Sequence, residues 1–586
     1  MERWMVAAKR ADFKGIAEKY NIDQVTARII RNRGIIEETE WKSYLYGTIE
    51  NLHNPRLLKD AEKAAKILKE KIAVGAKIRI IGDYDIDGIQ SVYILFSALE
   101  HCHAKVDYAI PHRIADGYGV NERLITQAIE EGIDTILTCD NGIAAKEALD
   151  QAKMHHMTVI ITDHHEVPYE EEDGQRKYIL PMADAVVNPK QEDCPYPYKG
   201  LCGAAVAFKL VQVLYEELEK DPNEALKYLE NAAFATVGDV MELTGENRIL
   251  VKAGLKALNH TKNYGIRALA EINEIPMGGI KSYHLGFVLG PCLNASGRLD
   301  TAKRALELLL SPNLKTAAEY AKDLYDLNAN RKEMTEKGIQ EAIELLECSD
   351  WKEDKVLVLY LPSCHESLAG IIAGRIREQY NRPVFVLTKG EECVKGSGRS
   401  IEEYSMYEEM TKCKDLFLKF GGHHMAAGLS LTEENVDRFR KQMNDNSTLT
   451  EEDLIPKISI DVPMPLDYIK QELIEEFKLL EPFGKANEKP VFADKNVKLL
   501  SYRVIGKHQN VCRMQVESQG GTKMTAIYFG QPESLLEFLK EKYGEKLLRD
   551  AECGRGHDIF LSLIYYPEIN EYNGRISLQI IVKNYC

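Results

Sequence analysis

Acidic side chains follow apolar, strand-like runs at three points of the 586-residue sequence. Residues 78–81 lead into three alternating carboxylates, residues 134–139 into one, and residues 158–162 into an acid and two histidines. In chain order, these residues are Asp83, Asp85 and Asp87; Asp140; and Asp163, His164 and His165. Carboxylates gathered at the carboxyl ends of neighbouring parallel strands repel each other, and a fold tolerates this chiefly where divalent cations neutralise them. The pattern therefore predicts a two-metal phosphoesterase site.

Hydrolysis of a phosphodiester by two metals sets requirements that these residues meet. It needs hard oxygen ligands, a carboxylate that bridges metals roughly 3.5–4 Å apart, and a water that is deprotonated near neutral pH. Asp239, which ends the run Thr-Val-Gly-Asp at 236–239, adds another oxygen donor. His164 can add an imidazole, which shifts the metal preference from calcium toward manganese, magnesium or zinc.

Each of these residues also has an ordinary explanation when taken alone. An Asp after a strand is more often a helix N-cap, and a His-His pair is usually not a ligand. The sequence has three such pairs, at 155–156, 164–165 and 423–424. The first lies at the end of a predicted helix, where histidine is common, and the last lies in a glycine-flanked loop. Only the pair at 164–165, after a buried strand and an Asp, has the neighbours that a metal ligand needs.

Alternating helix and strand patterns between residues 55 and 188 indicate how these side chains are positioned. Strands are expected at 78–81, 105–110, 134–138 and 158–162, and helical patterns at 61–72, 91–99, 122–131 and 144–154. Apolar strands separated by helices indicate βαβ units and a parallel sheet covered on both faces. Ligands of such sheets bind outside the carboxyl ends of the strands, which is where Asp83, Asp140 and Asp163 fall.

The rest of the chain predicts further domains. Residues 201–310 are mostly helical, and 316–346 form a polar helical run of the kind that connects domains. A second α/β unit begins at 355, with glycine-rich stretches at 395–400 and 420–428. A linker with three prolines follows, and the short strand-like segments beyond Pro490 suggest a small β-barrel.

Composition excludes several classes of protein. Hydrophobic residues make up 45% and charged residues 28% of the chain, which is typical of a globular protein. No run of eighteen apolar residues occurs, and the N-terminus lacks the apolar core of a signal peptide, so we expect no membrane association and a cytoplasmic location. The twelve cysteines form no Cys-x-x-Cys pair, which argues against a structural zinc site or an iron–sulfur cluster.

The net charge of −16 argues only weakly against a nucleic-acid substrate. Phosphate contacts require Lys and Arg, and these are unevenly distributed. Residues 491–586 have 13 basic and 11 acidic side chains, a balance of +2, so the preceding 490 residues hold −18. Acids of the predicted metal site contribute to that negative charge, and bound cations would offset them.

The motifs and their order resemble the DHH phosphoesterase superfamily, and within it the RecJ family of single-strand DNA exonucleases. The resemblance covers almost the whole chain. Its motifs are Gly-Asp-Tyr-Asp-Ile-Asp-Gly at 82–88, Cys-Asp-Asn-Gly at 139–142, Asp-His-His at 163–165, Gly-Asp at 238–239, Leu-Gly-Pro with Asn-Ala-Ser-Gly-Arg at 289–298, His-Glu at 365–366, Gly-Ser-Gly-Arg-Ser at 396–400, Gly-Gly-His with Ala-Ala-Gly at 421–428, and Leu-Glu-Pro-Phe-Gly at 480–484. One motif alone would be weak, whereas this many in order are hard to produce by chance.

The resemblance implies an α/β fold with a DHH-type parallel-sheet domain, a long connecting helix, a smaller α/β DHHA1-type domain and an OB-like β-barrel. The domains expected from it are an N-terminal segment (1–50), the DHH catalytic domain (51–312), the connecting helix (313–348), the DHHA1 substrate-binding domain (349–450), a linker (451–489) and the OB-fold-like nucleic-acid-binding domain (490–586).

The same resemblance implies roles for the acidic cluster. Metal binding would fall to Asp83, Asp85, Asp87, Asp140, His164 and Asp239, with Asp140 as the bridge and with Asp85 and Asp140 also catalytic. Asp163 is either a ligand or a partner that orients an imidazole. His165 would lie close to the scissile phosphate as a hydrogen-bond donor. The implied cofactors are two divalent cations, with Mn²⁺ preferred and Mg²⁺ the alternative.

A pocket for a terminal 5′-phosphate is also implied. Three arginines, Arg113, Arg298 and Arg399, are candidates for it, and Asn294, Ser397 and His423 complete the expected substrate-binding residues. Arginine fits a phosphate by forked donation, and Arg399 is expected in a glycine-rich turn beside Ser397. A surface ion pair is an equally good explanation for Arg113. Three sites depart from the family pattern. The run His-Glu-Ser-Leu-Ala-Gly at 365–370 stands where many relatives have His-Glu-Gly followed by Ile-Gly, Cys292 stands where Arg is common, and Ile81 stands where some members of the superfamily place a metal-binding His.

Together these features predict a single-stranded-DNA-specific 5′→3′ exonuclease that acts in recombination and repair. Its expected partners are single-stranded DNA with a 5′ end and, beyond that, a RecQ-type helicase and a single-strand-binding protein. One alternative is a phosphodiesterase of the same superfamily for short oligonucleotides or cyclic dinucleotides, which would not need a third domain. Another is a non-catalytic replisome scaffold, which would be expected to lose metal ligands.

Aromatic and basic side chains of the C-terminal segment are candidates for contact with unpaired bases. They are Tyr502, Arg503, Lys507, His508, Tyr528, Tyr565, Tyr566 and Tyr572. Aromatics can stack on bases at roughly 1–3 kcal/mol each. A tyrosine in a strand is more often part of a half-buried sheet surface, so each of them alone is a poor candidate.

Overall fold

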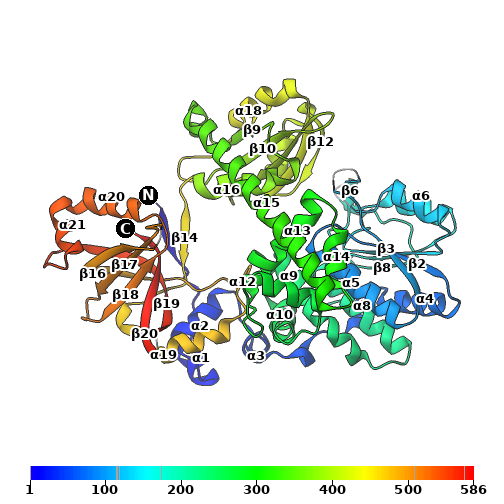
Figure 1. Cartoon of the computed structure of the whole chain (residues 1–586), viewed down its shortest axis with the longest axis horizontal. Helices are drawn as coiled ribbons and strands as arrows, with labels where there is room; N and C mark the ends of the chain where they lie inside the picture. The colour runs from blue at the N-terminus through cyan, green and yellow to red at the C-terminus, as the bar shows by residue number, and fades with distance from the viewer. Residues whose placement is uncertain (1, 114–115, 118, 173–174, 507, 573) are drawn as a thin grey trace. The chain divides into compact units, whose positions relative to one another are not determined.

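The computed structural model describes residues 2–113, 116–117, 119–172, 175–506, 508–572 and 574–586. The chain forms two compact units: Thr48–Pro456, and Met1–Gly47 together with Lys457–Cys586 (Figure 1). The two units are described separately below. No helix in the described part of the chain combines the length and apolar character needed to cross a membrane.

A five-stranded parallel sheet organises the first half of the larger unit. Its order is β3 (Lys105–Ala109), β2 (Lys77–Ile81), β4 (Thr135–Cys139), β5 (Thr158–Thr162) and β8 (Ala185–Val187). Alternate side chains of each strand enter two different cores: Ile80 and Leu137 face one, and Ile81 and Ile136 face the other. The predicted parallel sheet with two covered faces is confirmed.

The helices on the two faces supply those cores. The first core receives α4 (Ala61–Ala73), α5 (Ile86–His101) and α8 (Gly203–Glu217), and the second receives α6 (Glu122–Glu130) and α7 (Lys146–Met154). Their apolar residues recur at helical spacing, for example Ala61, Ala64, Ala65 and Leu68 in α4, so one stripe of each helix is buried. Because the strands are parallel, the connections from each strand to the following helix all lie at the carboxyl edge of the sheet.

Helices make up the remainder of this domain and the connection to the next. They are α9 (Leu229–Gly238), α10 (Gly245–Leu258), α11 (Tyr264–Ile272), the π-helical η4 (Leu285–Leu289), α13 (Gly290–Leu299) and α14 (Lys303–Leu309). The 34-residue helix α15 (Leu314–Glu347) begins at Asn313, whose side chain accepts the N–H of Thr316. It packs on α11, α13 and α14 near its start and on α16 (Ala369–Tyr380) further along, which confirms the predicted connecting helix.

A second, mixed sheet forms the smaller domain of this unit. Its order is β12 (Phe417–Gly422), β13 (Ala426–Leu431), β11 (Val394–Arg399), β10 (Val384–Lys389) and β9 (Leu357–Tyr360). The glycine-rich stretch that contains Arg399 is strand β11 and not the expected turn. Its glycines lie in extended backbone paired on both sides, and Gly398 faces Phe385 and Met406 where no side chain would fit.

The C-terminal strands close into the predicted barrel. Strands β16 (Phe492–Ile505), β17 (Val511–Glu517), β18 (Lys523–Tyr528), β20 (Arg575–Tyr585) and β19 (Phe560–Tyr572) pair in that order, and β16 also pairs with β19. Only the β18–β20 pairing in this ring is parallel. A five-stranded ring with this pairing is the arrangement of an OB fold.

The N-terminal residues and the expected linker belong to the barrel's unit. Helices α1 (Phe13–Tyr20), α2 (Gln24–Asn32) and α3 (Glu38–Tyr46) contribute Ile29 and Trp41 to one core with Leu466, Phe477 and Phe492. The sequence predicted a linker at 451–489 that is separate from the barrel domain. In the structure, the chain from Lys457 onward belongs to the same compact unit as the barrel. Prolines suggested a linker, whereas the apolar residues between them are buried in this core.

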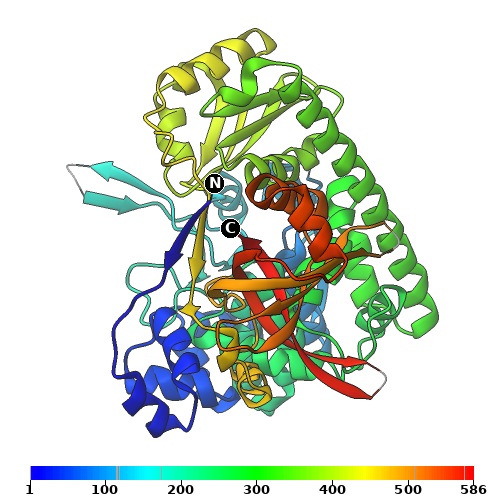
Figure 2. The same cartoon turned by 90° about the vertical axis from the view of Figure 1, so that its left-hand side faces the viewer.

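A two-stranded hairpin follows the Asp-His-His triplet directly. It consists of β6 (Tyr169–Glu172) and β7 (Gln175–Tyr178), and all side chains of these strands are exposed. It projects from the domain that contains the parallel sheet (Figure 2).

Candidate metal and phosphate site

The connection from β2 to α5 places three carboxylates at the edge of the parallel sheet. Asp83 lies just past the strand, and Asp85 is the N-cap of α5, accepting the N–H groups of Asp87 (3.0 Å) and Gly88 (3.1 Å). Asp87 accepts the first N–H groups of another helix, those of Gly203 (2.6 Å) and Ala204 (2.7 Å) in α8. A helix N-terminus favours a carboxylate, so α8 fixes the Asp87 side chain and stabilises its charge.

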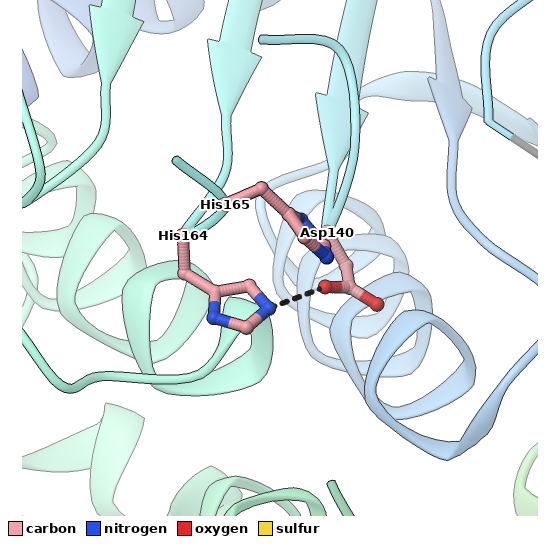
Figure 3. A group of neighbouring side chains, drawn as sticks. All are labelled: Asp140, His164 and His165. Atoms are coloured by element: carbon pink, nitrogen blue, oxygen red, sulfur yellow. Dashed lines mark ion pairs between the residues drawn. The ribbon is translucent and has the colours of Figure 1, made fainter. Parts of the chain in front are cut away.

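His164 gathers carboxylates from three other segments around one ring nitrogen. Its Nε2 lies 3.1 Å from Asp140 Oδ1 (Figure 3). The same nitrogen lies 3.5 Å from Asp87 Oδ2 and 3.9 Å from Asp239 Oδ2. Asp140 follows β4, His164 follows β5, and Asp239 is the C-cap of α9. All but Asp239 are buried. The structure thus brings together residues that span more than 150 positions of the sequence.

The donor atoms fall into three overlapping groups. Within each group, one ligand atom per residue lies within 4.8 Å of the others. The groups are Asp87 with His164 and Asp239; Asp83 with Asp85 and Asp140; and Asp140 with His164 and His165. Asp140 and His164 each belong to two groups, so neighbouring cation positions would share ligands.

Asp163 differs from the other strand-end acids because the protein itself uses both its oxygens. Oδ1 contacts the backbone N–H groups of His164 (2.7 Å) and His165 (3.1 Å) and the Nδ1 of the His165 ring (2.7 Å), while Oδ2 accepts the N–H of Ile143 (2.9 Å). It belongs to none of the three groups. Of the two roles expected for Asp163, this geometry fits the orientation of His165 and not metal binding.

Burial and mutual repulsion disturb the ionisation of the cluster. Burial, with the charge of Asp85 adding to it, raises the pKa of Asp83 to about 8. Burial followed by the charge of Asp87 raises the pKa of Asp85 and, more strongly, that of Asp140. These carboxylates cannot all be ionised near neutral pH unless positive charge is supplied.

The two histidines are shifted in opposite directions. Burial lowers the pKa of His164, which leaves its imidazole neutral and able to act as a ligand. Burial opposes protonation of His165 as well, but the hydrogen bond to Asp163 and the charges of Asp163, Asp87 and Asp239 together outweigh it and raise the pKa of His165. For Asp163 itself, burial is outweighed by the His165 contact and by backbone donors, so its pKa is lowered.

The donor set fits a hard divalent cation. The Asp83 carboxylate is buried and accepts no hydrogen bond of good geometry from the described residues. Carboxylate oxygens with one neutral imidazole suit manganese or magnesium. Cys139 and Cys202 lie nearby, but burial raises the pKa of both thiols well above the usual value, so neither supplies a thiolate for a softer metal.

The three arginines predicted to bind a phosphate form a second candidate site, in the same unit as the acidic cluster. Arg298 donates from Nη1 to the carbonyl of Ser367 (2.9 Å), which places it just before α16. Arg399 donates to Ser397 Oγ (3.2 Å), and a Cβ at Gly370 in α16 would lie 2.7 Å from its Nη2. The Arg113 guanidinium lies 4.9 Å from the centre of the Tyr84 ring.

These arginines have the electrostatics of an anion site. Burial, and then the charges of Arg113 and Arg331, lower the pKa of Arg298 to about 10. Burial and Arg113 also lower the pKa of Arg399. None of the three forms an ion pair with a carboxylate in the described part of the chain, so the surface pair considered for Arg113 is not found. Clustered cations without carboxylates favour a bound phosphate.

The remaining predicted contact residues are less clearly placed. Asn294 lies on α13, one turn before Arg298, and its Oδ1 is buried. His423 lies in the exposed turn between β12 and β13, where its Nδ1 accepts the N–H of Met425 (3.2 Å).

The sequence argument missed Arg331, whose charge acts on Arg298. It lies on α15, its Nε donates to Asn328 Oδ1 (3.0 Å), and burial lowers its pKa. The only available signal was the helical spacing of Asn328, Arg331 and Thr335, which is common to many helices.

Most of the tyrosines considered for base stacking are core residues of the barrel. Tyr502, Tyr565 and Tyr566 are buried, and Tyr528 packs edge-on against Tyr585. Lys507 and the side chain of Tyr572 lie outside the described residues. Strand parity accounts for Tyr502, which is buried while the next residue, Arg503, and its partner across β16 and β17, Arg513, are exposed.

Comparison with known proteins identifies the family. The family described as "DHH family, N-terminal domain" matches residues 77–236, the DHHA1 domain matches 353–447, and the RecJ OB domain matches 460–584. The single-stranded-DNA-specific exonuclease RecJ of Bacillus subtilis is 33% identical over 587 residues, covering 99% of this chain and 70% of that protein. The chain belongs to the RecJ family. The predicted OB-like barrel is the RecJ OB domain of this family.

Solved RecJ structures support the same conclusion. RecJ from Thermus thermophilus in complex with Mn²⁺ matches with a TM-score of 0.81 and 26% identity, covering all of this chain and 79% of that one. The complex of the same protein with Mg²⁺ matches with a TM-score of 0.76 and 26% identity, covering 100% of this chain and 78% of that one. The fold class predicted from sequence is confirmed.

Proposed function

We propose that this RecJ-family chain is a metal-dependent exonuclease that hydrolyses single-stranded DNA from its 5′ end and releases mononucleotides. Its role would lie in recombination and repair. The observation that carries this proposal is the convergence of Asp87, Asp140 and Asp239 on the Nε2 of His164. Three carboxylates from separate segments, gathered around one neutral imidazole, need cations to be stable together in their ionised form.

Two cations would occupy the site, with Mn²⁺ preferred and Mg²⁺ the alternative. Asp87, His164 and Asp239 would hold one, Asp83 and Asp85 the other, and Asp140 would lie between them. When bound, such cations supply an activated water and positive charge for the scissile phosphate. The chain's own contribution is to fix the ligands, which it does through the helix N-termini that bind Asp85 and Asp87.

His165 would act on the phosphate as a hydrogen-bond donor. Its Nδ1 is held by Asp163, which leaves Nε2 to contact a phosphate oxygen or the leaving group. Asp163 also favours the protonated ring, as the raised pKa of His165 indicates. Asp163 is therefore a positioning residue in this proposal.

Arg113, Arg298 and Arg399, with Ser397, would receive the terminal 5′-phosphate and so set the polarity of degradation. Asn294 and His423 would add contacts to the strand. The RecJ OB domain would bind single-stranded DNA, with Arg503 and Arg513 on its outer face. A RecQ-type helicase and a single-strand-binding protein would act alongside the enzyme.

The test compares Asp140→Asn with Asp134→Asn. Both residues flank β4, but Asp134 lies at the opposite end of the strand and pairs with Lys71 (2.6 Å). We expect D140N to lose at least about a thousandfold in mononucleotide release from a 5′-phosphorylated single strand and to lose its Mn²⁺-induced rise in melting temperature. D134N should keep both.

The substrate series uses dinucleotides, long single strands and duplexes, each labelled at either end. Preference for long single strands with release from the 5′ end supports the proposal. Faster turnover of dinucleotides would favour the short-substrate phosphodiesterase, and full activity of D140N would refute the metal site.

A further inference from the structure

An ion pair fixes the segment of chain that presents Arg113. The Asp116 side chain, only 6% exposed, accepts the Nε of Arg123 on Oδ1 (2.6 Å) and its Nη2 on Oδ2 (2.6 Å). Oδ2 also accepts the backbone N–H of His112 (2.8 Å), while the Asp116 N–H donates to the His112 carbonyl (2.8 Å). His112 and Asp116, which these bonds join, are called the turn, and Arg113 follows His112 directly in the sequence.

The turn delivers Arg113 to the space between the acidic cluster and Arg298. Arg113 stacks over Tyr84, the residue between the carboxylates Asp83 and Asp85. The Tyr84 carbonyl oxygen would lie 2.4 Å from a Cβ at Gly297, the residue before Arg298. A small displacement of the turn would therefore move Arg113 away from Tyr84 and from Arg298.

The ion pair has no other evident task. Helix α6 is already capped, because Asn121 Oδ1 accepts the N–H of Leu124 (3.1 Å). Arg123 is 60% exposed, and an exposed pair contributes little to global stability. Forked donation does, however, hold a carboxylate in one orientation. The ion pair therefore affects the conformation of the turn and not the stability of the whole domain.

We propose that Asp116 and Arg123 are positioning residues that hold Arg113 where it receives the terminal phosphate of the DNA strand. The proposal rests on the proposed function, since it concerns how the phosphate pocket is assembled. Neither residue touches the phosphate or the metals.

The experiment measures the preference for a 5′ end. It takes kcat/KM for one single-stranded oligonucleotide with a 5′-phosphate, divided by kcat/KM for the same strand with a 5′-hydroxyl. We expect D116N and R123A each to lower this ratio about tenfold, which is the effect of losing one charged hydrogen bond. The loss should come from a higher KM for the 5′-phosphate strand, and kcat on the 5′-hydroxyl strand should be unchanged. The double variant should lose no more than either single one, because both act on one turn.

The decisive arm uses Arg113→Gln. In that background D116N should lower the preference no further, because the group that it positions is gone. R56A is the control: Arg56 bonds Glu216 (2.9 Å) and Glu217 (3.0 Å) elsewhere in the same domain, and its loss should leave the preference unchanged. Thermal unfolding of each variant shows whether the substitution has destabilised the folded protein.

Three results would overturn the inference. One is an unchanged preference in D116N and R123A when R113Q has lost it, which leaves the proposed function intact. Another is an equal loss on both substrates, which indicates a purely structural role. The third is a further loss when D116N is added to R113Q. Failure of the wild-type protein to degrade single strands would instead refute the proposed function.

Discussion

Neighbouring acids at one sheet edge reach opposite ionisation states because their hydrogen bonds differ. Backbone donors and His165 stabilise the Asp163 carboxylate, so its pKa is lowered despite complete burial. Asp83, with no well-formed hydrogen bond from the described residues, has its pKa raised to about 8 by burial and by Asp85. The sequence motif does not distinguish the two, but their surroundings favour a structural role for Asp163 and the proposed cation binding for Asp83.

A partly buried acid outside the site predicts a pH dependence of stability. Burial raises the pKa of Glu230, at the start of α9, to about 7, and its Oε1 accepts the hydroxyl of Thr261 (2.7 Å). A folded pKa above the unfolded one means that this group's stabilising effect is complete below about pH 4.5 and is lost as the pH rises toward 7. Glu230→Gln should therefore raise the free energy of unfolding above pH 7 by about 2–3 kcal/mol.

Urea unfolding at pH 5 and pH 8 measures this effect. The difference between wild type and E230Q should be small at pH 5 and should favour the variant at pH 8. An equal difference at both values would mean that Glu230 titrates normally.

At the scale of elements, the contact between the end of β2 and the start of α5 holds the first acidic motif together. A Cβ at Gly88 would lie 2.5 Å from the Asp83 carbonyl oxygen, closer than real contacts allow. Only glycine lets α5 begin this close to the strand, and this closeness directs Asp83, Asp85 and Asp87 toward one edge. The helix start thus belongs to the proposed metal site as well as to the fold.

Replacing this glycine should damage stability and metal binding together. We expect Gly88→Ala to cost about 2–3 kcal/mol of unfolding free energy, the range for overpacked core positions, and to abolish the Mn²⁺-induced rise in melting temperature. Gly374→Ala, in α16 with no atom within 4 Å of the added Cβ, should instead stabilise by about 0.5–1 kcal/mol. Calorimetry with and without Mn²⁺ tests both, and a G88A variant that binds Mn²⁺ normally would contradict the packing argument.

At the scale of the whole molecule, the two ends of the chain fold as one unit. Ile29, Trp41 and Leu45 from the N-terminal helices share a core with Phe477 and Phe492. Neither segment buries these side chains without the other. The catalytic unit, Thr48–Pro456, has its own separate cores.

Two truncations should therefore behave differently. A chain of residues 48–456 should unfold cooperatively and keep metal-dependent hydrolysis of short single strands, whereas residues 1–456 should expose the N-terminal apolar face and bind hydrophobic dyes or aggregate. Size-exclusion chromatography and dye fluorescence compare them. A monodisperse, dye-free 1–456 chain would show that the N-terminal helices do not need the C-terminal segment.

The sequence alone determined the elements and the chemistry of the catalytic domain. Its strands end where the apolar runs end, and Asp83, Asp140 and Asp163 stand at those ends, because strand and helix periodicities are local properties of the chain. Parallel topology then requires the strand ends to meet at one edge. The motif order was also enough to indicate the RecJ family.

Only the tertiary structure decided which atoms meet. The proximity of Asp239 to His164 and of Arg331 to Arg298 joins distant segments, which no local spacing encodes. Asp163 and His165 are close in sequence, but the backbone N–H of Ile143, from another segment, occupies the second oxygen of Asp163. The same holds for Tyr565, which is buried because barrel closure sets which strand face points inward, and for the N-terminal helices, whose partner lies more than 400 residues away. Local patterns specify elements, whereas long-range packing selects their partners and so the ionisation state of each side chain.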